Sequence, residues 1–257
     1  MPAASAAATS SPPKLRVLCV HGYRQTAEVF RSKFGCWRKP LKNIAEFEFV
    51  TAPHIPNIEG LSAEECASQR GWWFSRPERH FKATDYTDTD EGFQESLQLL
   101  LCTIKEKGPF DGLIGFSQGA TMIALLLAQL NVAPDLAEGV GVQQLPRFVV
   151  LIAGFLSRSS QHRFLRHCAP LRLPSLHLHG LADERVPTEM GDELSAVFED
   201  ALTLRHEGGH CVPPLSAVLK PKVIQFLHNF RGQTPTLVDG ERPSQGRGVL
   251  KGDVSCT

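Results

Sequence analysis

Gly115-Phe116-Ser117-Gln118-Gly119 is the stretch of the sequence that decides the fold. The apolar run at 113–116 is typical of a buried strand, and the run at 120–130 is typical of a helix. A serine between such elements lies on a tight strand-to-helix turn, where flanking glycines remove side chains that would clash. Its hydroxyl is then exposed at a helix N-terminus, where amides favour developing negative charge. The stretch predicts a serine nucleophile, with an ordinary Gly/Ser turn as the alternative.

Short apolar runs alternate with helical patterns on both sides of this stretch. Strands are expected at 15–20, 47–50, 113–116, 147–153, 176–179 and 202–205, and helices at 27–41, 93–104, 120–130, 189–199 and 215–230. The first helix is expected to stop near Pro40, and Asp90 is a candidate N-cap of the second. This alternation predicts an α/β fold with a mostly parallel central sheet and helices on both faces.

The domain organisation follows from the same pattern. Residues 14–231 are expected to form one α/β-hydrolase domain, and the irregular residues 54–89 to form a cover over the site. Residues 1–13 are rich in Ala, Ser and Pro and residues 232–257 are rich in Gly, Pro and polar residues, so disordered tails are expected at both ends.

The composition narrows the function classes. The 257 residues carry 27 Lys+Arg against 27 Asp+Glu, and a neutral chain has no overall field to hold a nucleic acid. No run approaches the ~18 apolar residues of a membrane span, and residues 1–13 lack the features of a secretory signal. Seven cysteines without a C-x-x-C motif favour free thiols in a reducing compartment. The expected location is intracellular, in the cytoplasm.

A serine hydroxyl needs a base that takes its proton, and a histidine is the usual choice. His210 follows the last predicted strand, and the two glycines before it let its loop fold back toward Ser117. Asp183 follows the preceding predicted strand and could orient the imidazole, with Glu184 as the local alternative. The chain order serine, aspartate, histidine is the order expected of α/β-hydrolases.

Such chemistry also needs two backbone N–H groups that stabilise the developing oxyanion. The residue after the nucleophile, Gln118, is expected to supply one of them. The loop after the first predicted strand is expected to supply the other, and Gly22 there permits a close backbone approach. Tyr23 is therefore the second candidate donor.

The chain resembles the eukaryotic family of serine hydrolases, FSH, and most closely its animal members. The resemblance covers about residues 14–230 and rests on five motifs in order: Val20-His21-Gly22-Tyr23, Gly71-Trp72-Trp73, Gly115-Phe116-Ser117-Gln118-Gly119, His179-Gly180-x-x-Asp183 and Gly209-His210. It implies carboxylesterase activity on a small-molecule ester, with Ser117 as nucleophile, Asp183 as acid and His210 as base. It implies little about the natural ester.

Aromatic residues suggest which esters fit. Trp72, Trp73, Phe74, Phe116 and Phe155 are expected to line the substrate groove, which would favour medium-to-long straight-chain alkyl esters. A plug in the core is the equal alternative for the three aromatics at 72–74. A thioesterase or a serine peptidase would use the same triad.

Two further alternatives lie outside this reading. His177 and His179 share one face of a predicted strand and, with Asp183 and His210, could suggest a metal site. Neither histidine falls in a recognised ligand pattern, so no metal and no organic cofactor are expected. A catalytically silent fold that only binds a ligand is the second alternative, and the presence of all three triad residues speaks against it.

Overall fold

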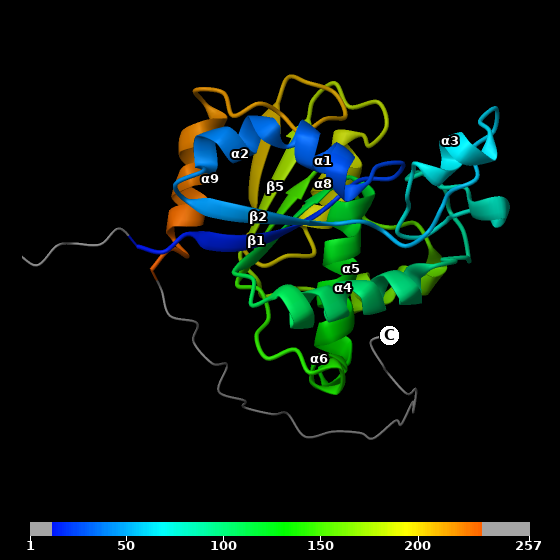
Figure 1. Ribbon diagram of the computed structural model, residues 1–257, viewed down its shortest axis with the longest axis horizontal. Helices are drawn as coiled ribbons and strands as arrows, with labels where there is room; N and C mark the ends of the chain where they lie inside the picture. Colours follow the sequence, from blue (N-terminus) through cyan, green and yellow to red (C-terminus); the bar gives the residue numbers. More distant parts are fainter. Residues whose placement is uncertain (1–11, 233–257) are drawn as a thin grey trace, which may run out of the picture.

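The computed structural model describes residues 12–232, and this part of the chain contains one six-stranded sheet (Figure 1). Its strands are β1 (Leu15–Val20), β2 (Ala45–Val50), β3 (Gly112–Phe116), β4 (Phe148–Ile152), β5 (Ser175–Gly180) and β6 (Leu202–His206). Their spatial order is β2-β1-β3-β4-β5-β6, and every neighbouring pair is parallel. The predicted parallel sheet is confirmed. Most of each expected tail, at 1–11 and 233–257, lies outside the described residues.

Helices cover both faces of the sheet. They are α1 (Ala27–Lys33), α2 (Gly35–Leu41), α3 (Ala63–Ala67), α4 (Phe93–Lys107), α5 (Gln118–Val132), α6 (Asp135–Val140), α7 (Phe164–His167), α8 (Thr188–Ser195) and α9 (Leu219–His228), with short 3-10 turns η1 (Pro77–Arg79) and η2 (Ser160–His162). In Figure 1, α1, α2 and α9 lie on one side of the sheet and α4, α5 and α6 on the other, while α3 lies apart from the sheet.

Two apolar cores result from this arrangement, one on each face. In β1, residues 15, 17 and 19 pack toward α1, α2 and α9, whereas Leu18 and Val20 pack toward α4 and α5. This alternation follows from the period of two in a strand. Every residue of β3, β4 and β5 is buried, as a parallel sheet covered on both faces requires.

Two local predictions are corrected by the structure. The expected single helix at 27–41 is two helices that meet at Phe34, and Pro40 lies inside α2 instead of ending it. Pro40 has no N–H to donate to the carbonyl four residues earlier, and α2 ends one residue after it. Asp90 is not the N-cap of α4: Gly92 holds that position with a left-handed φ of 88°, which a glycine adopts without strain.

The carboxyl ends of the parallel strands meet at one edge of the sheet, and the predicted reactive residues follow three of these ends. Ser117 comes directly after β3, Asp183 follows β5, and His210 lies in the connection from β6 to α9. Ligands of open α/β sheets bind at this edge. Within residues 12–232, no helix is long and apolar enough to cross a membrane. Cys19, Cys36, Cys66, Cys168 and Cys211 are free thiols, and Cys102 is not among them.

Candidate active site

Ser117 occupies a strained turn between β3 and α5. Its φ of 53° and ψ of −120° lie outside the regions that a side chain normally permits. A Cβ atom at Gly115 would lie 2.5 Å from the Ala120 Cα, and one at Gly119 would lie 2.3 Å from the His21 carbonyl oxygen. The two glycines are therefore required for the close packing that holds this turn, which presents the Ser117 hydroxyl at the N-terminus of α5.

A hydrogen-bonded chain links the three predicted side chains. His210 Nε2 lies 2.9 Å from Ser117 Oγ, and His210 Nδ1 lies 2.7 Å from Asp183 Oδ2. When the proton of the neutral imidazole is on Nδ1 and forms a hydrogen bond with Asp183, Nε2 carries no proton and can accept that of the Ser117 hydroxyl. The structure thus brings together residues from three separate loops in the order that proton transfer requires.

The loops that carry Asp183 and His210 are bound to each other. The amide of Ala182 donates to the Gly208 carbonyl, and the amide of Leu181 donates to the His206 carbonyl. A Cβ atom at Gly180 would lie 2.3 Å from the Gly208 carbonyl oxygen, so the end of β5 requires a residue without a side chain. This packing fixes the histidine loop against the aspartate loop.

Asp183 is held in its ionised form. Burial works to raise its pKa, but hydrogen bonds from His210 and from the Val186 and Arg185 amides outweigh burial and leave the pKa below its ordinary value. Both amides donate to Oδ1 at 2.9 Å, whereas Oδ2 faces His210. The neighbouring Glu184 is exposed and lies along the cavity instead, so the geometry favours Asp183 over this local alternative.

The two expected oxyanion donors flank the serine. Tyr23 lies in the loop after β1 and Gln118 is the first residue of α5. Within the described residues, neither backbone N–H donates a hydrogen bond to another protein group. A Cβ atom at Gly22 would lie 2.8 Å from the Phe116 ring, so this glycine permits the close approach of the Tyr23 loop to β3. Both amides are available to an oxyanion.

A cavity of about 1080 Å³ opens at Ser117 and His210. Its lining combines apolar and charged side chains: Tyr23, Arg24, Gln25, Lys33, Phe81, Lys82, Ala83, Thr84, Phe116, Glu184, Arg185, Val186, Cys211 and Val212. The expected cover at 54–89 thus contributes residues 81–84 to this lining.

The expected lining is corrected for four of five aromatic residues. Phe116 lines the cavity, but Trp72, Trp73, Phe74 and Phe155 are each at most 1% exposed and belong to the buried core. The rings of Trp73 and Phe155 pack on one another and on Phe81. Burial of their large apolar surfaces is the physical reason for this placement. Phe81, which was not among the predicted lining residues, lines the cavity together with Phe116.

Trp72 and Trp73, here called the tryptophan segment, are hydrogen-bonded to the turn that carries Ser117. The Gln118 side chain accepts a hydrogen bond from the Trp72 amide at 2.9 Å and donates one to the Trp73 carbonyl at 2.7 Å. Trp72 Nε1 donates to the His21 carbonyl at 2.7 Å. These bonds join the segment to the nucleophile turn and to the loop after β1. Sequence reasoning missed this role of the Gln118 side chain.

His21 is a second residue whose role sequence reasoning missed. It is buried, and burial lowers its pKa to about 4, so the imidazole is neutral. Its Nδ1 donates to the Gly22 carbonyl and its Nε2 accepts from the Ala52 amide. The ring therefore fixes the start of the Tyr23 loop. The only sequence signal was its place in the Val20-His21-Gly22-Tyr23 motif.

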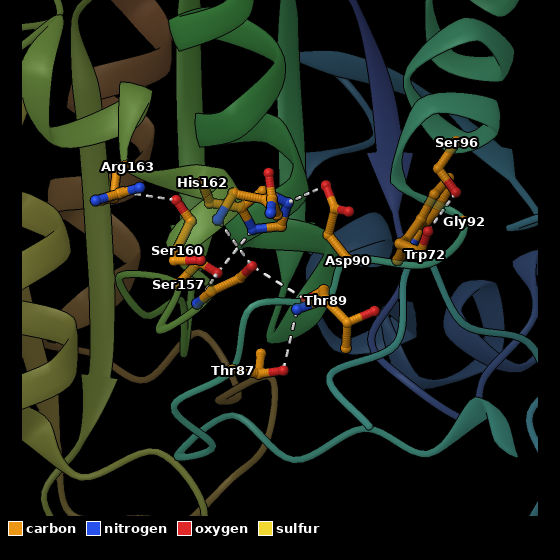
Figure 2. A network of polar contacts seen from close by, with 12 residues as sticks. Trp72, Thr87, Thr89, Asp90, Gly92, Ser96, Ser157, Ser160, His162 and Arg163 are labelled. Carbon is orange, nitrogen blue, oxygen red and sulfur yellow. Dashed lines mark hydrogen bonds and ion pairs between the residues drawn. The ribbon is translucent and has the colours of Figure 1, made fainter. Parts of the chain in front are cut away.

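A separate polar network anchors the cover segment to the loop after β4, as Figure 2 shows. The buried His162 ring accepts or donates at Nδ1 toward Ser157 Oγ, 2.8 Å away, and its Nε2 lies 3.4 Å from Asp90 Oδ2. The Ser160 amide donates to the Thr87 carbonyl at 2.8 Å. The segment at 87–90 is thereby tied to the body of the protein.

The metal alternative finds no support in the described residues. Within residues 12–232, no group of three or more His, Cys, Asp or Glu side chains could hold a metal ion. Burial lowers the pKa of His177 to about 3 and also lowers the pKa of His179. A Cβ atom at Gly191 would lie 2.2 Å from the His179 ring, so this histidine packs tightly beneath α8.

The chain is similar in sequence to known serine hydrolases and esterases. Residues 9–221 match the family model described as serine hydrolase (FSH1). The chain is 41% identical over 220 residues to Esterase C25G4.2 of Caenorhabditis elegans, covering 85% of this chain and 95% of the relative. It is 38% identical over 226 residues to Esterase OVCA2 of Homo sapiens, covering 84% and 96% respectively.

Solved structures show the same fold at low sequence identity. The structure of Zea mays acyl-protein thioesterase 2 superposes with a TM-score of 0.53 at 16% identity, over 85% of this chain and 94% of that chain. Esterase PE8 gives a TM-score of 0.51 at 18% identity, over 85% and 94%. Likeness at this level of identity establishes the fold alone.

Proposed function

This chain belongs to the serine hydrolase (FSH1) family and is a carboxylic-ester hydrolase, and from that premise we propose that Ser117, His210 and Asp183 are its catalytic triad. The hydrogen-bonded chain of 2.9 Å and 2.7 Å from Ser117 Oγ through His210 to Asp183 is the observation that carries this proposal. The strained turn and the helix N-terminus at Ser117 support it further.

In the first half of the reaction, Ser117 Oγ attacks the ester carbonyl carbon while its proton passes to His210 Nε2. Asp183 accepts the Nδ1 proton in a hydrogen bond, keeps the imidazole in the productive tautomer and stabilises the imidazolium. The tetrahedral oxyanion is stabilised by the Tyr23 and Gln118 amides. His210 then protonates the departing alcohol as the C–O bond breaks, which leaves an acyl group on Ser117.

In the second half, water replaces the alcohol. His210 takes a proton from this water as the oxygen attacks the acyl carbon, and the same two amides stabilise the second tetrahedral intermediate. When the bond to Ser117 breaks, His210 returns the proton to Oγ and the carboxylic acid is released. The cycle ends with the enzyme in its starting protonation state.

We further propose that the substrates are medium-to-long straight-chain alkyl esters. The apolar side chains along the cavity, chiefly Phe81, Phe116, Val186 and Val212, support this preference. Each methylene removed from water contributes up to about 0.8 kcal/mol, so kcat/KM would rise by at most roughly fourfold per carbon until the lining is covered. A series of p-nitrophenyl esters from two to fourteen carbons measures this rise, and a flat or falling profile contradicts it.

The proposed nucleophile is tested with a fluorophosphonate probe, which forms a covalent bond with an activated serine. The intact protein should be labelled at a single site, and peptide mapping should locate the label on Ser117. Absence of labelling in a folded protein that also fails to cleave p-nitrophenyl esters would favour a silent ligand-binding fold. Labelling elsewhere would remove Ser117 from its proposed role.

A further inference from the structure

We propose that the active-site cavity selects esters that carry an anionic group, a carboxylate or a phosphate, and that Arg24, Lys82 and Arg185 bind this group. The proposal rests on the esterase function above and adds a substrate class to it. The apolar lining bears on the length of the alkyl chain, whereas this proposal concerns the charge of the substrate.

The lining of the cavity is strongly cationic although the chain as a whole is neutral. Four side chains along it are cations, Arg24, Lys33, Lys82 and Arg185, and they are opposed by the single exposed carboxylate of Glu184. The chain overall has 27 cations and 27 anions. A cleft lined by charge of one sign focuses the electrostatic field and raises the local concentration of ligands of the opposite sign.

These four cations form no ion pair with the described residues, whereas some of the cations elsewhere on the surface do. Among residues 12–232, no ion pair involves Arg24, Lys33, Lys82 or Arg185. Outside the cavity, at least nine Lys and Arg side chains pair with carboxylates, and the bidentate contact of Arg205 with Asp192 is an example. The positive charge along the cavity is therefore left for a ligand to neutralise.

Arg24 is held in place at a conformational cost. It has a left-handed φ of 64°, which is unfavourable for a residue with a side chain. Its amide donates to the Arg70 carbonyl at 2.8 Å, and its Nε donates to Gln69 Oε1 at 2.6 Å. The two terminal nitrogens make no hydrogen bond with the described residues. A planar pair of donors of this kind fits the oxygens of a carboxylate or phosphate.

The three proposed binding residues line the same cavity as Ser117 and His210 and come from three different loops. Arg24 directly follows Tyr23, a proposed oxyanion donor. Lys82 follows Phe81, whose ring packs on the Tyr23 ring with centroids 5.2 Å apart. Arg185 is tied to the catalytic loop because its amide donates to Asp183. An anion bound among them would lie close to the ester bond that Ser117 attacks.

The experiment compares two pairs of substrates that share the same scissile bond and a matched acyl chain, and in each pair only one member carries an anionic group. One pair places the charge on the acyl side: the mono-p-nitrophenyl ester of suberic acid, with a terminal carboxylate, against p-nitrophenyl octanoate. A second pair places phosphates on the leaving group: octanoyl-coenzyme A against the neutral octanoyl thioester of N-acetylcysteamine. For each pair, the measured quantity is the ratio of kcat/KM for the anionic substrate to kcat/KM for the neutral one. The two pairs distinguish a carboxylate on the acyl side from phosphates on the leaving group.

The variants are Arg24→Gln, Lys82→Gln and Arg185→Gln, singly and together. In the native protein, one ratio should exceed one at low salt and fall toward one in about 1 M salt, where screening is nearly complete. Each neutralised cation should lower the ratio by up to about fivefold, mainly through KM. Lys222→Gln on α9, an equal charge change outside the cavity, is the matched control and should leave the ratio unchanged.

Two further variants separate charge from positioning. Gln69→Ala removes the partner of Arg24 Nε and keeps the charge, whereas Arg24→Lys keeps the charge and removes the guanidinium. Both should retain part of the preference for the anionic substrate, and Arg24→Gln should retain least. If Gln69→Ala and Arg24→Gln lower both kcat/KM values equally and leave the ratio fixed, Arg24 only supports the loop and the proposal is overturned.

The proposal is also overturned if neither ratio exceeds one, or if the triple variant keeps the native ratio. In those cases, continued cleavage of p-nitrophenyl octanoate and labelling of Ser117 would leave the esterase assignment standing. Loss of labelling as well as of both ratios would instead indicate failure of the proposed function itself.

Discussion

Residues 12–232 contain two serine–histidine–aspartate groups, and these groups differ in almost everything except their residue types. In one, His210 lies between Ser117 and Asp183 at 2.9 Å and 2.7 Å. In the other, His162 lies between Ser157 and Asp90 at 2.8 Å and 3.4 Å. The imidazoles are also reversed, because Nδ1 faces the aspartate in the first group and the serine in the second.

The surroundings separate a reactive group from a structural one. Ser117 has a left-handed φ, begins α5 and opens on the large cavity. Ser157 has no such strain and lies outside that cavity, and the ring of His162 is enclosed by Phe93 and Trp73 at centroid distances of 4.6 Å and 5.5 Å. Catalytic capacity therefore depends on access, strain and oxyanion donors, and three matching side chains are not sufficient.

The sharpest way to test this contrast is to remove each serine hydroxyl. Ser117→Ala should abolish fluorophosphonate labelling and lower kcat by a factor on the order of 10⁴ or more, because the nucleophile is lost. Ser157→Ala should keep labelling and remain within about twofold of the native kcat/KM. Steady-state kinetics on both variants measure the difference. A Ser117→Ala enzyme with a tenth of native activity would refute the assignment.

The next largest effect concerns the partners of Ser117. His210→Ala should be nearly as damaging as Ser117→Ala, and Asp183→Asn should lose somewhat less. The double variant should be little worse than His210→Ala, since the members of a triad act as one unit. Glu184→Gln is the control for charge near Asp183. Additive losses, or a Glu184→Gln variant worse than Asp183→Asn, would contradict the proposed roles.

His162→Phe tests the second group, because it keeps a ring of similar size and removes both polar contacts. It should lower the free energy of unfolding by about 1–3 kcal/mol, as Ser157 and Asp90 lose their common partner. Urea denaturation measures this loss, and labelling of Ser117 in the folded variant checks that the reactive group persists. Loss of labelling without loss of stability would assign His162 to the reaction instead.

The smallest expected effect is on the pH profile. Only a neutral His210 accepts the serine proton, so kcat/KM should fall when this imidazole is protonated. Asp183, whose pKa is lowered, stays ionised and should add no second limb between about pH 5 and 8. Its contribution to stability is present above its unfolded pKa and is lost as pH falls through its lower folded pKa. Asp183→Asn should therefore lose less stability on acidification than the native protein.

The sequence allowed the fold and the three central residues to be predicted because their signals are local. The alternation of apolar runs indicated a parallel sheet, and the glycines around Ser117 identified a turn whose geometry depends on those few residues. Asp183 and His210 were found from their places after the predicted strands. Parallel strands bring such positions to one edge of the sheet, so chain order predicted that these side chains lie together.

What could not be predicted depends on contacts between distant residues. The aromatic character of Trp72 and Trp73 predicts burial or a groove equally well, and only the packing of Gln118 against both shows that they support the turn. Asp90 fits a helix N-cap by sequence, yet it faces His162, which is 72 positions later in the chain. Charge along the cavity is a property of three loops and the end of α1 together, and it is hidden in a neutral composition.

The hydrogen bonds of Gln118 to the tryptophan segment have a consequence for how substrate enters. A lid that opens to activate an enzyme must be separable from the catalytic groups beneath it. Here, detachment of Trp72 and Trp73 would break two bonds to the first residue of α5 and one to the His21 carbonyl, and so would release the oxyanion loop and the nucleophile turn together. We therefore expect opening at this segment to lower activity, which is the opposite of interfacial activation by its displacement. The cover instead borders the cavity through residues 81–84.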